Sequence, residues 1–263
     1  MHATDTKDSV SGLQPLELNR ELKTIPVKDF HGVKVYTRTS YLKALEEGNM
    51  TSDKEHLTIS ISRKVDFSKD VAVFGSKKLR DYIITSSDSF QALYLSFILN
   101  TTFGKMGLLN GGDREKSLTN IRAVGRTMIP YPSAETVLYC GTLENMIRFL
   151  GSIIDRLDDV SNSIKAVRSF LANVREYIVM EMIAPEFFGS RDVHILESWK
   201  ETVNYFSLEN MDRINEATPE NSLEMTMALF DKCLEFGNPL MQNLNKMKAY
   251  ISDIRVHFED LRR

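Results

Sequence analysis

Basic and amide side chains gather in turns of the first half of the chain, where they could bind nucleic acid. Lys and Arg neutralise phosphates, Arg can also read guanine, and Asn can read adenine. Three basic residues follow Gly75-Ser76, and others surround the glycine-containing segment from Gly104 to Gly112. Our candidate phosphate contacts are Lys77, Lys78, Arg80, Lys105, Arg114, Lys116, Arg122 and Arg126, and our candidate base readers are Asn110 and Asn120.

The sequence motifs of the common enzyme classes do not occur in the chain. Gly104-Lys105-Met106-Gly107 lacks the Gly-Lys-Ser/Thr ending of a phosphate-binding loop. Asn238-Pro239 is followed by Leu240, so the Asn-Pro-Pro-Tyr motif of an amino-methyltransferase is absent. The 5 His residues show neither HExxH nor HxxxH spacing. We therefore expect a protein that is not an enzyme and that has no catalytic residues, no metal site and no cofactor.

Composition indicates an ordinary globular protein. Hydrophobic residues make up 42% of the 263 residues and charged residues 26%, enough for one large or two small domains. No apolar run reaches the roughly 20 residues that span a bilayer, and the polar first residues lack the apolar core of a secretory signal. The 2 Cys residues have no CxxC spacing. These features predict a cytoplasmic protein with reduced thiols and no membrane partner.

The sign of the net charge changes near residue 134. Residues 1–134 contain more Lys and Arg than Asp and Glu, whereas residues 135–263 contain fewer, and the whole chain carries a net charge of -3. A basic half could face phosphates while an acidic half faces protein or solvent. Chance asymmetry would give the same pattern, so charge alone does not decide.

The first half has the pattern of an α+β domain. We expect a flexible tail over residues 1–14 and a mixed α/β domain over residues 15–134. Short β-rich runs predict strands at residues 24–27, 33–36, 57–62, 71–74 and 82–85. Asp88 could cap a helix that ends near Asn100. We expect the glycines from Gly104 onward to interrupt the chain before a short strand that ends in Pro130-Tyr131-Pro132.

The second half, residues 135–263, has the pattern of long helices. Apolar residues at heptad spacing run from Leu143 to Ile178 and again from Leu240 to Leu261. The first run predicts a coiled-coil-like helix of about 40 residues, or two helices if Ser161-Asn162-Ser163 breaks it. We expect the two apolar seams to pack against each other in antiparallel fashion. A plain helical bundle would show the same stripes.

Residues 90–158 resemble the target-recognition domains of type I restriction specificity subunits. In that family a helix ends near an Asn, as at Asn100 here, and a glycine-containing segment with a Leu-Thr-Asn-like run follows. An Ile-Pro-x-Pro turn, here Ile129 to Pro132, then precedes a spacer helix. The Glu-Gln that the family has after the prolines is replaced by residues 133–136, Ser-Ala-Glu-Thr.

Residues 174–188 are similar to a segment of the TaqI-like C-terminal specificity regions of fused methyltransferase–restriction enzymes. Glu181, Pro185 and Glu186 match the pattern of that segment, whereas Met182 and Ala184 depart from it. The two resemblances together cover roughly residues 55–195. Neither motif is catalytic in those families.

The resemblances imply a DNA sequence-recognition module of a restriction–modification-type system. Its implied partners are double-stranded DNA and a separate DNA methyltransferase or restriction subunit, and a homodimer is a further option. The alternative is a non-enzymatic helical adaptor or assembly protein in which a degenerate recognition domain serves as scaffold. Salt-dependent binding to duplex DNA would separate the first function from the second.

Overall fold

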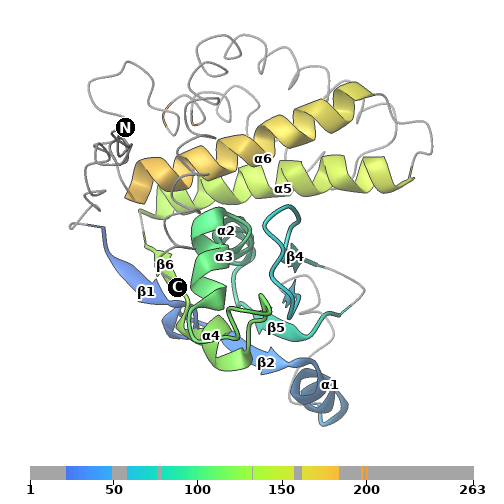
Figure 1. The fold of residues 1–263 in the computed structure, drawn as a ribbon, viewed down its shortest axis with the longest axis vertical. Helices are drawn as coiled ribbons and strands as arrows, with labels where there is room; N and C mark the ends of the chain where they lie inside the picture. The colour runs from blue at the N-terminus through green and yellow to red at the C-terminus, as the bar shows by residue number, and fades with distance from the viewer. Residues whose placement is uncertain are drawn as a thin grey trace, which may run out of the picture.

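The computed structural model describes residues 22–48, 58–75, 79–131, 133–156 and 162–183, together with Glu197 and Lys200. These residues form a mixed α/β fold with two small antiparallel sheets. Figure 1 shows helices α5 (Ala134–Arg156) and α6 (Asn162–Ile183) side by side along one side of the molecule, with α2 (Ser89–Leu99) and the sheets beneath them.

The larger sheet has four strands in the order β2-β5-β3-β4. Its strands are β2 (Lys34–Thr37), β3 (Thr58–Ile61), β4 (Ala72–Phe74) and β5 (Tyr82–Thr85). Each lies within or beside a β-rich run of the sequence, so the predicted strands are confirmed. Ile59 and Ile61 share a fully buried face, but the polar Thr58 and Ser60, which alternate with them on the other face, are buried as well. The sheet is thus covered on both faces at β3.

Helix α2 lies at the centre of the fold, between the larger sheet and α5. Asp88 caps it, as predicted, because its carboxylate accepts a hydrogen bond from the backbone N of Gln91 at 2.7 Å. Every residue from Ala92 to Leu99 is buried, the property of a helix that other elements surround on all sides.

The glycine segment does not interrupt the chain where the sequence suggested. Helix α3 (Thr102–Leu109) includes both Gly104 and Gly107, and the turn comes only at Gly111, where φ is +94°. A Cβ at Gly104 would collide with the carbonyl oxygen of Ile98, and one at Gly107 would lie 2.7 Å from Cγ2 of Thr127. These glycines therefore permit close packing of α3 and do not end it.

A second sheet joins distant parts of the chain. Strand β1 (Thr24–Pro26) pairs with β6 (Met128–Pro130), which immediately precedes the turn to α5. The short helix η1 (Val27–Asp29) continues from β1 and packs against α4 (Ile121–Arg126). Helix α1 (Arg38–Glu46) follows β2. Strand β6 and its position before the long helix confirm the predicted short strand, whereas α4 was not expected.

The heptad pattern of the first seam belongs to two helices. Helix α5 ends at Arg156 and α6 begins at Asn162, and the two run side by side in opposite directions (Figure 1). The option of one unbroken helix is therefore wrong for this stretch, and the described part of the chain shows no long coiled coil. The seam from Leu240 to Leu261 lies outside the described residues, so its pairing stays a prediction.

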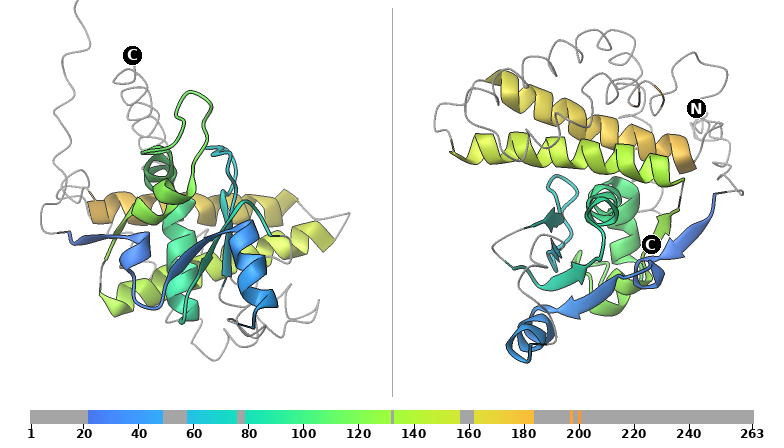
Figure 2. Two further views of the ribbon diagram at one scale, coloured as in Figure 1. Left: turned by 90° about the horizontal axis from the view of Figure 1, so that it is seen from below. Right: turned by 180° about the vertical axis from the view of Figure 1, so that it is seen from behind.

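One hydrophobic cluster includes residues from both sides of position 134. It extends from Val27 in η1 through α2 to Leu143 in α5 and Ile183 in α6. The views in Figure 2 show that the α5–α6 pair packs on the side of the fold that contains α2. No helix among the described residues is long and apolar enough to cross a membrane.

Candidate functional site

Several of the basic residues predicted to bind DNA instead make hydrogen bonds inside the fold. Lys105 is 4% exposed and its Nζ donates a hydrogen bond to the carbonyl oxygen of Phe67 at 3.2 Å. Burial, with a further contribution from nearby Arg175, lowers the pKa of Lys105 below its ordinary value. The side chain is therefore in no position to reach a phosphate on the surface.

The guanidinium group of Arg80 also makes hydrogen bonds within the fold. Its Nη1 donates to Ser62 Oγ at 3.0 Å and lies within 3.2 Å of the carbonyl oxygens of Asp70 and Val71. It thereby links the start of β5 to the connection between β3 and β4. Lys77 and Lys78, which precede it in the sequence, lie outside the described residues.

The two predicted base readers have different surroundings. Asn120 caps α4: its Oδ1 accepts from the backbone N of Ala123 at 2.9 Å, and its Nδ2 donates to the carbonyl oxygen of Gly111 at 2.7 Å. Both ends of that amide are occupied within the chain. Asn110 is exposed, and its Oδ1 accepts from Nη2 of Arg114 at 2.7 Å, which orients this guanidinium group.

The remaining predicted residues are exposed. Arg114 and Lys116 lie on the loop between α3 and α4, which projects from the body of the molecule in Figure 2, and Arg122 and Arg126 lie on α4. Lys116 pairs with Asp113 at 3.7 Å, a contact with 74% of the Lys116 side chain exposed and hence of little energetic weight.

Two other segments bring basic residues next to this loop and helix. Backbone hydrogen bonds of 2.9 Å from Val65 N to Ser117 O and from Thr119 N to Arg63 O hold the segment Arg63-Lys64 alongside the loop. On the other side, the side chain of Lys28 lies near Gly125 of α4, 3.7 Å from where a Cβ would be. We call the exposed residues of these adjoining segments the basic surface: Lys28, Arg63, Lys64, Arg114, Lys116, Arg122 and Arg126.

Sequence reasoning did not find Lys28, Arg63 and Lys64. They are separated from α4 by tens of residues along the chain, and no local pattern distinguishes them from solvent-exposed lysines and arginines elsewhere. Lys64 and Val65 lie beyond the predicted strand at residues 57–62 and beyond the end of β3 at Ile61. Only the isolated bridge between Lys64 and Leu118 places this segment beside the loop.

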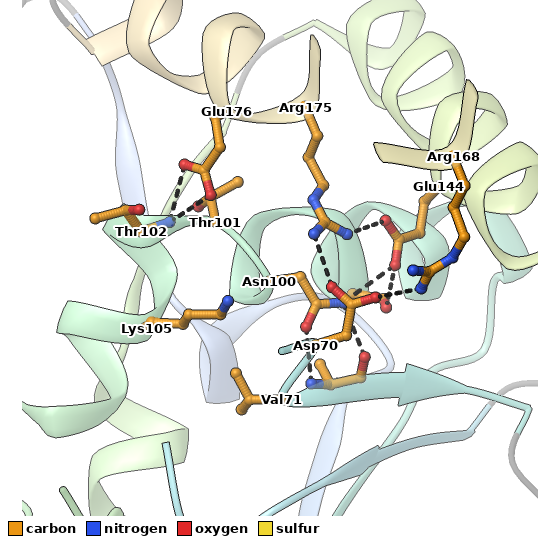
Figure 3. A network of polar contacts seen from close by, with 12 residues as sticks. Asp70, Val71, Asn100, Thr101, Thr102, Lys105, Glu144, Arg168, Arg175 and Glu176 are labelled. Carbon is orange, nitrogen blue, oxygen red and sulfur yellow. Dashed lines mark hydrogen bonds and ion pairs between the residues drawn. The ribbon is translucent and has the colours of Figure 1, made fainter. Parts of the chain in front are cut away.

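A second cluster of charged residues is buried where α6 meets the rest of the fold (Figure 3). Arg175 lies at its centre: Nη1 bonds to Glu144 Oε2 of α5 at 3.0 Å, and Nη2 bonds to Asp70 Oδ1 at 2.7 Å. Burial alone would lower the pKa of Arg175, but the two carboxylates outweigh it and raise the pKa. We call Asp70, Asn100, Glu144, Arg175 and Glu176 the buried charge cluster.

The other members of this cluster are also hydrogen-bonded. Asn100, at the C-terminal end of α2, accepts from the backbone N of Ala72 at 2.9 Å and donates to its carbonyl oxygen at 2.8 Å. Both carboxylate oxygens of Glu176 accept from the backbone N of Thr102 at 2.9 Å, at the start of α3. The cluster thus ties α6 to α2, α3, α5 and β4, a structural role that accounts for the charges.

In the part of the chain described, the metal-ligating side chains are scattered and the cysteine is buried. The described residues contain no group of three or more His, Cys, Asp or Glu side chains that could hold a metal ion. Cys140 is fully buried and reduced, and burial raises the pKa of its thiol well above the ordinary value. A thiol in such surroundings is a packing residue and not a nucleophile.

Comparison with known proteins gives no match for this chain. No family model matches the sequence, and searches of curated proteins and of solved structures find no relative. The functional interpretation therefore depends on the chain's own residues and on the surfaces that its fold creates.

Proposed function

We propose that this chain is a DNA sequence-recognition module of a restriction–modification-type system. It would act in the cytoplasm with a separate DNA methyltransferase or restriction subunit and perform no chemistry itself. The observation that carries the proposal is the basic surface, in which three chain-distant segments present seven exposed Lys and Arg side chains around α4 and its preceding loop.

The basic surface suits the phosphate backbone of a duplex. Asp29, Asp113 and Glu115 lie on the same segments, and Asp81 accepts a hydrogen bond from the backbone N of Arg63 at 2.8 Å. These four carboxylates offset part of the charge of the seven basic side chains, so the surface keeps an excess of positive charge. Its loop is a firm support: Asp113 and Leu118 exchange two backbone hydrogen bonds of 2.8 Å, and Asn120 closes the base of the loop. Arginines on a rigid loop can enter a groove with little loss of conformational entropy.

Within this surface we assign different roles to the arginines. Arg122 and Arg126 are exposed on α4, one helical turn apart, and would contact successive phosphates. Arg114 is at the projecting loop and is oriented by Asn110, so it is the residue best placed to read guanine in a groove. Arg80, Lys105 and Asn120, which the fold uses internally, are left out of the interface.

The test is the salt dependence of duplex binding by the full chain. Fluorescence anisotropy with a pool of random-sequence duplexes would be measured for the wild type and for Arg122→Ala/Arg126→Ala. Each lost phosphate contact should lower the slope of log Kd against log salt by about one. The double variant should therefore lose about two units of slope.

A matched control removes the same charge elsewhere. Lys43→Ala/Lys165→Ala changes two exposed lysines on α1 and α6 and should leave the slope unchanged. If both double variants lose the same amount of slope, the change in slope reflects only the net charge of the protein, and the assignment of the basic surface is contradicted. A wild-type chain that binds no duplex at low salt would reject the proposal in favour of the adaptor function.

A further inference from the structure

Tyr131 presents an aromatic ring at the surface on a rigid support. It is 44% exposed, although it follows directly after strand β6. Its backbone N donates to the carbonyl oxygen of Lys23 at 2.7 Å. The preceding carbonyl, that of Pro130, accepts a hydrogen bond of 2.7 Å from the hydroxyl of Tyr94, a fully buried residue of the central helix. The backbone at Tyr131 is therefore fixed to the core.

The orientation of the Tyr131 ring is also fixed. Phe30, which is 3% exposed, meets the ring in an edge arrangement with centroids 5.4 Å apart and an angle of 71° between the planes. The ammonium group of Lys23 lies over the ring, 5.8 Å from its centroid. An exposed aromatic ring with a neighbouring cation can stack on a nucleobase while the cation meets the adjoining phosphate.

The ring lies at the end of a short path from the basic surface. Lys28, a member of that surface, lies in η1, and the three residues of strand β1 separate that helix from Lys23 beside Tyr131. The five residue steps from Lys28 to Lys23 span at most about 17 Å, which is about the axial rise of five nucleotides in one DNA strand. A strand whose phosphates contact α4 and η1 would thus reach the ring after a few nucleotides.

We propose that Tyr131 is a stacking site for an unpaired nucleobase, with Lys23 as the contact for its phosphate. The inference rests on the proposed function, because the basic surface holds the neighbouring duplex. A base inside an intact duplex has both faces stacked and cannot use the ring. The site therefore predicts tighter binding to a duplex that carries a single-stranded extension than to the same duplex with blunt ends.

The charge of the surroundings favours nucleic acid over a peptide as the occupant. Lys23 is adjacent to the ring, and Lys28 and Arg126 are exposed around the β1–β6 pair. Among the described residues Asp29 is exposed there too, and Glu135, four residues after Tyr131, is paired with Lys200 at 3.5 Å. Proteins that hold single strands combine basic side chains along the strand with exposed aromatic rings, and the ring gives affinity without much sequence preference.

The test compares two probes and four proteins. The probes are a blunt duplex and the same duplex with a five-nucleotide single-stranded extension that carries 2-aminopurine, and the proteins are wild type, Tyr131→Ala, Tyr131→Phe and Met128→Ala. Wild type should prefer the extended probe, and its binding should change the 2-aminopurine fluorescence. Tyr131→Ala should lose roughly 5- to 140-fold in affinity for the extended probe, the range for loss of one stacked base.

The other variants and the blunt probe separate the outcomes. Tyr131→Phe keeps the ring and should retain the preference, and Met128→Ala, which removes the 42% exposed side chain of β6, should also retain it. If Tyr131→Ala binds the extended probe as tightly as wild type does, the stacking site is contradicted. If wild type still binds the blunt duplex in that case, the proposed DNA-binding function is unaffected. Wild type that binds neither probe would overturn both.

Discussion

Helix α5 meets the centre of the fold through apolar and small side chains and one buried carboxylate, Glu144, whereas its neighbour α6 contributes a buried guanidinium group and a second carboxylate. On α5, Leu143 and Ile147 are buried, and Gly141 brings the helix close to the backbone of α2 at Phe90. On α6, Arg175 and Glu176 reach Asp70, Glu144 and the start of α3. Two helices of nearly equal length in one hairpin thus share one charge cluster, but α6 contributes more of its charged groups than α5 does.

The difference matters because the two kinds of contact respond differently to change. Apolar burial has no direction, and a packed helix can shift slightly while it keeps most of its stabilisation. A buried guanidinium group bonded to two carboxylates has one acceptable geometry, and the loss of any partner leaves a charge without compensation. We therefore expect α6 to have the more exactly defined register and the greater sensitivity to single substitutions.

The largest effect should come from the centre of the buried charge cluster. Arg175→Met leaves the nearly fully buried Glu144 carboxylate without its cation, which should lower the free energy of unfolding by about 3–5 kcal/mol. Urea unfolding followed by circular dichroism would measure it. Lys165→Met, at an exposed position of the same helix, should change stability by less than about 0.5 kcal/mol.

The double variant Glu144→Gln/Arg175→Met sharpens this result. The amide oxygen of Gln can still accept the hydrogen bonds that Glu144 Oε1 takes from Ser96 and Asn100, and neither partner is then charged. The loss should be smaller than for Arg175→Met alone by about 2 kcal/mol. Additive losses would show that the charges are not coupled and would remove the distinction between the two helices.

Two glycines in α5 allow the tightness of packing to be compared on the side of the helix that faces α2 and on the side that faces α6. A Cβ at Gly141 would lie 3.2 Å from the carbonyl oxygen of Phe90 in α2, and a backbone atom cannot move aside. Gly141→Ala should therefore destabilise the fold by about 1–3 kcal/mol. At Gly151 the nearest atom is Nε of Arg168 at 3.2 Å, which belongs to a long side chain of α6 and not to a backbone.

Gly151→Ala should accordingly change stability by less than about 0.5 kcal/mol. The gain from replacing a helical Gly offsets the small cost of moving Arg168, whose ion pair with Asp70 is partly exposed. Thermal unfolding of the two variants would give the comparison. A greater loss at Gly151 than at Gly141 would reverse our view of which side of α5 is tightly packed.

The N-cap of α4 gives a stability change outside helices α5 and α6 with which the effects in those helices can be compared. Asn120→Ala removes the acceptor for Ala123 N and the donor to Gly111 O, and the expected cost is about 1–2 kcal/mol. The same variant would also be tested on duplexes of different sequence. A changed sequence preference with unaltered stability would restore Asn120 as a base reader and contradict its structural role.

Within the buried charge cluster, the smallest effect should come from Asp70, its most exposed carboxylate. Burial raises its pKa, but Arg175 and then Arg168 outweigh burial, so the pKa lies below its ordinary value. A carboxyl group with a lowered folded-state pKa stabilises the fold above its unfolded-state pKa of about 3.9. That contribution disappears as the pH falls through the folded-state pKa.

Asp70→Asn should therefore cost about 1 kcal/mol at pH 7, a value reduced because 27% of the Asp70 side chain is exposed. The difference from wild type should stay constant between pH 7 and pH 5 and shrink only below about pH 4. Urea unfolding across this range is the measurement. A difference that already shrinks between pH 7 and pH 5 would contradict the assigned partners of Asp70.

Local signals in the sequence predicted the elements that depend on neighbouring residues. The β-branched run at residues 82–85 gives β5, and Asp88 caps α2 as expected. Helix α3 was missed because Gly104 and Gly107 read as breaks, although close packing with Ile98 and Thr127 explains them. That packing depends on contacts which no window of the sequence contains.

For the candidate site, too, the sequence predicted what depends on neighbouring residues and missed what depends on distant contacts. Arg122 and Arg126 are exposed as expected of basic residues next to a turn, whereas Lys105 is buried because α3 packs it against the β3–β4 connection. Asp70, Glu144 and Arg175 come from three distant parts of the chain. Their only local sign is a charged residue directly beside an apolar seam position, as Glu144 follows Leu143, and that sign does not reveal a partner.

The pairing of β1 with β6 has a consequence for the order of folding. Thr24 pairs with Pro130, so this contact closes a loop of about a hundred residues and raises the contact order of the domain. During synthesis at 5–20 residues per second, β1 would wait roughly 5–20 s for its partner strand. The larger sheet and α2 can form in that interval, which leaves the strand pair that positions Tyr131 among the last parts of the domain to assemble.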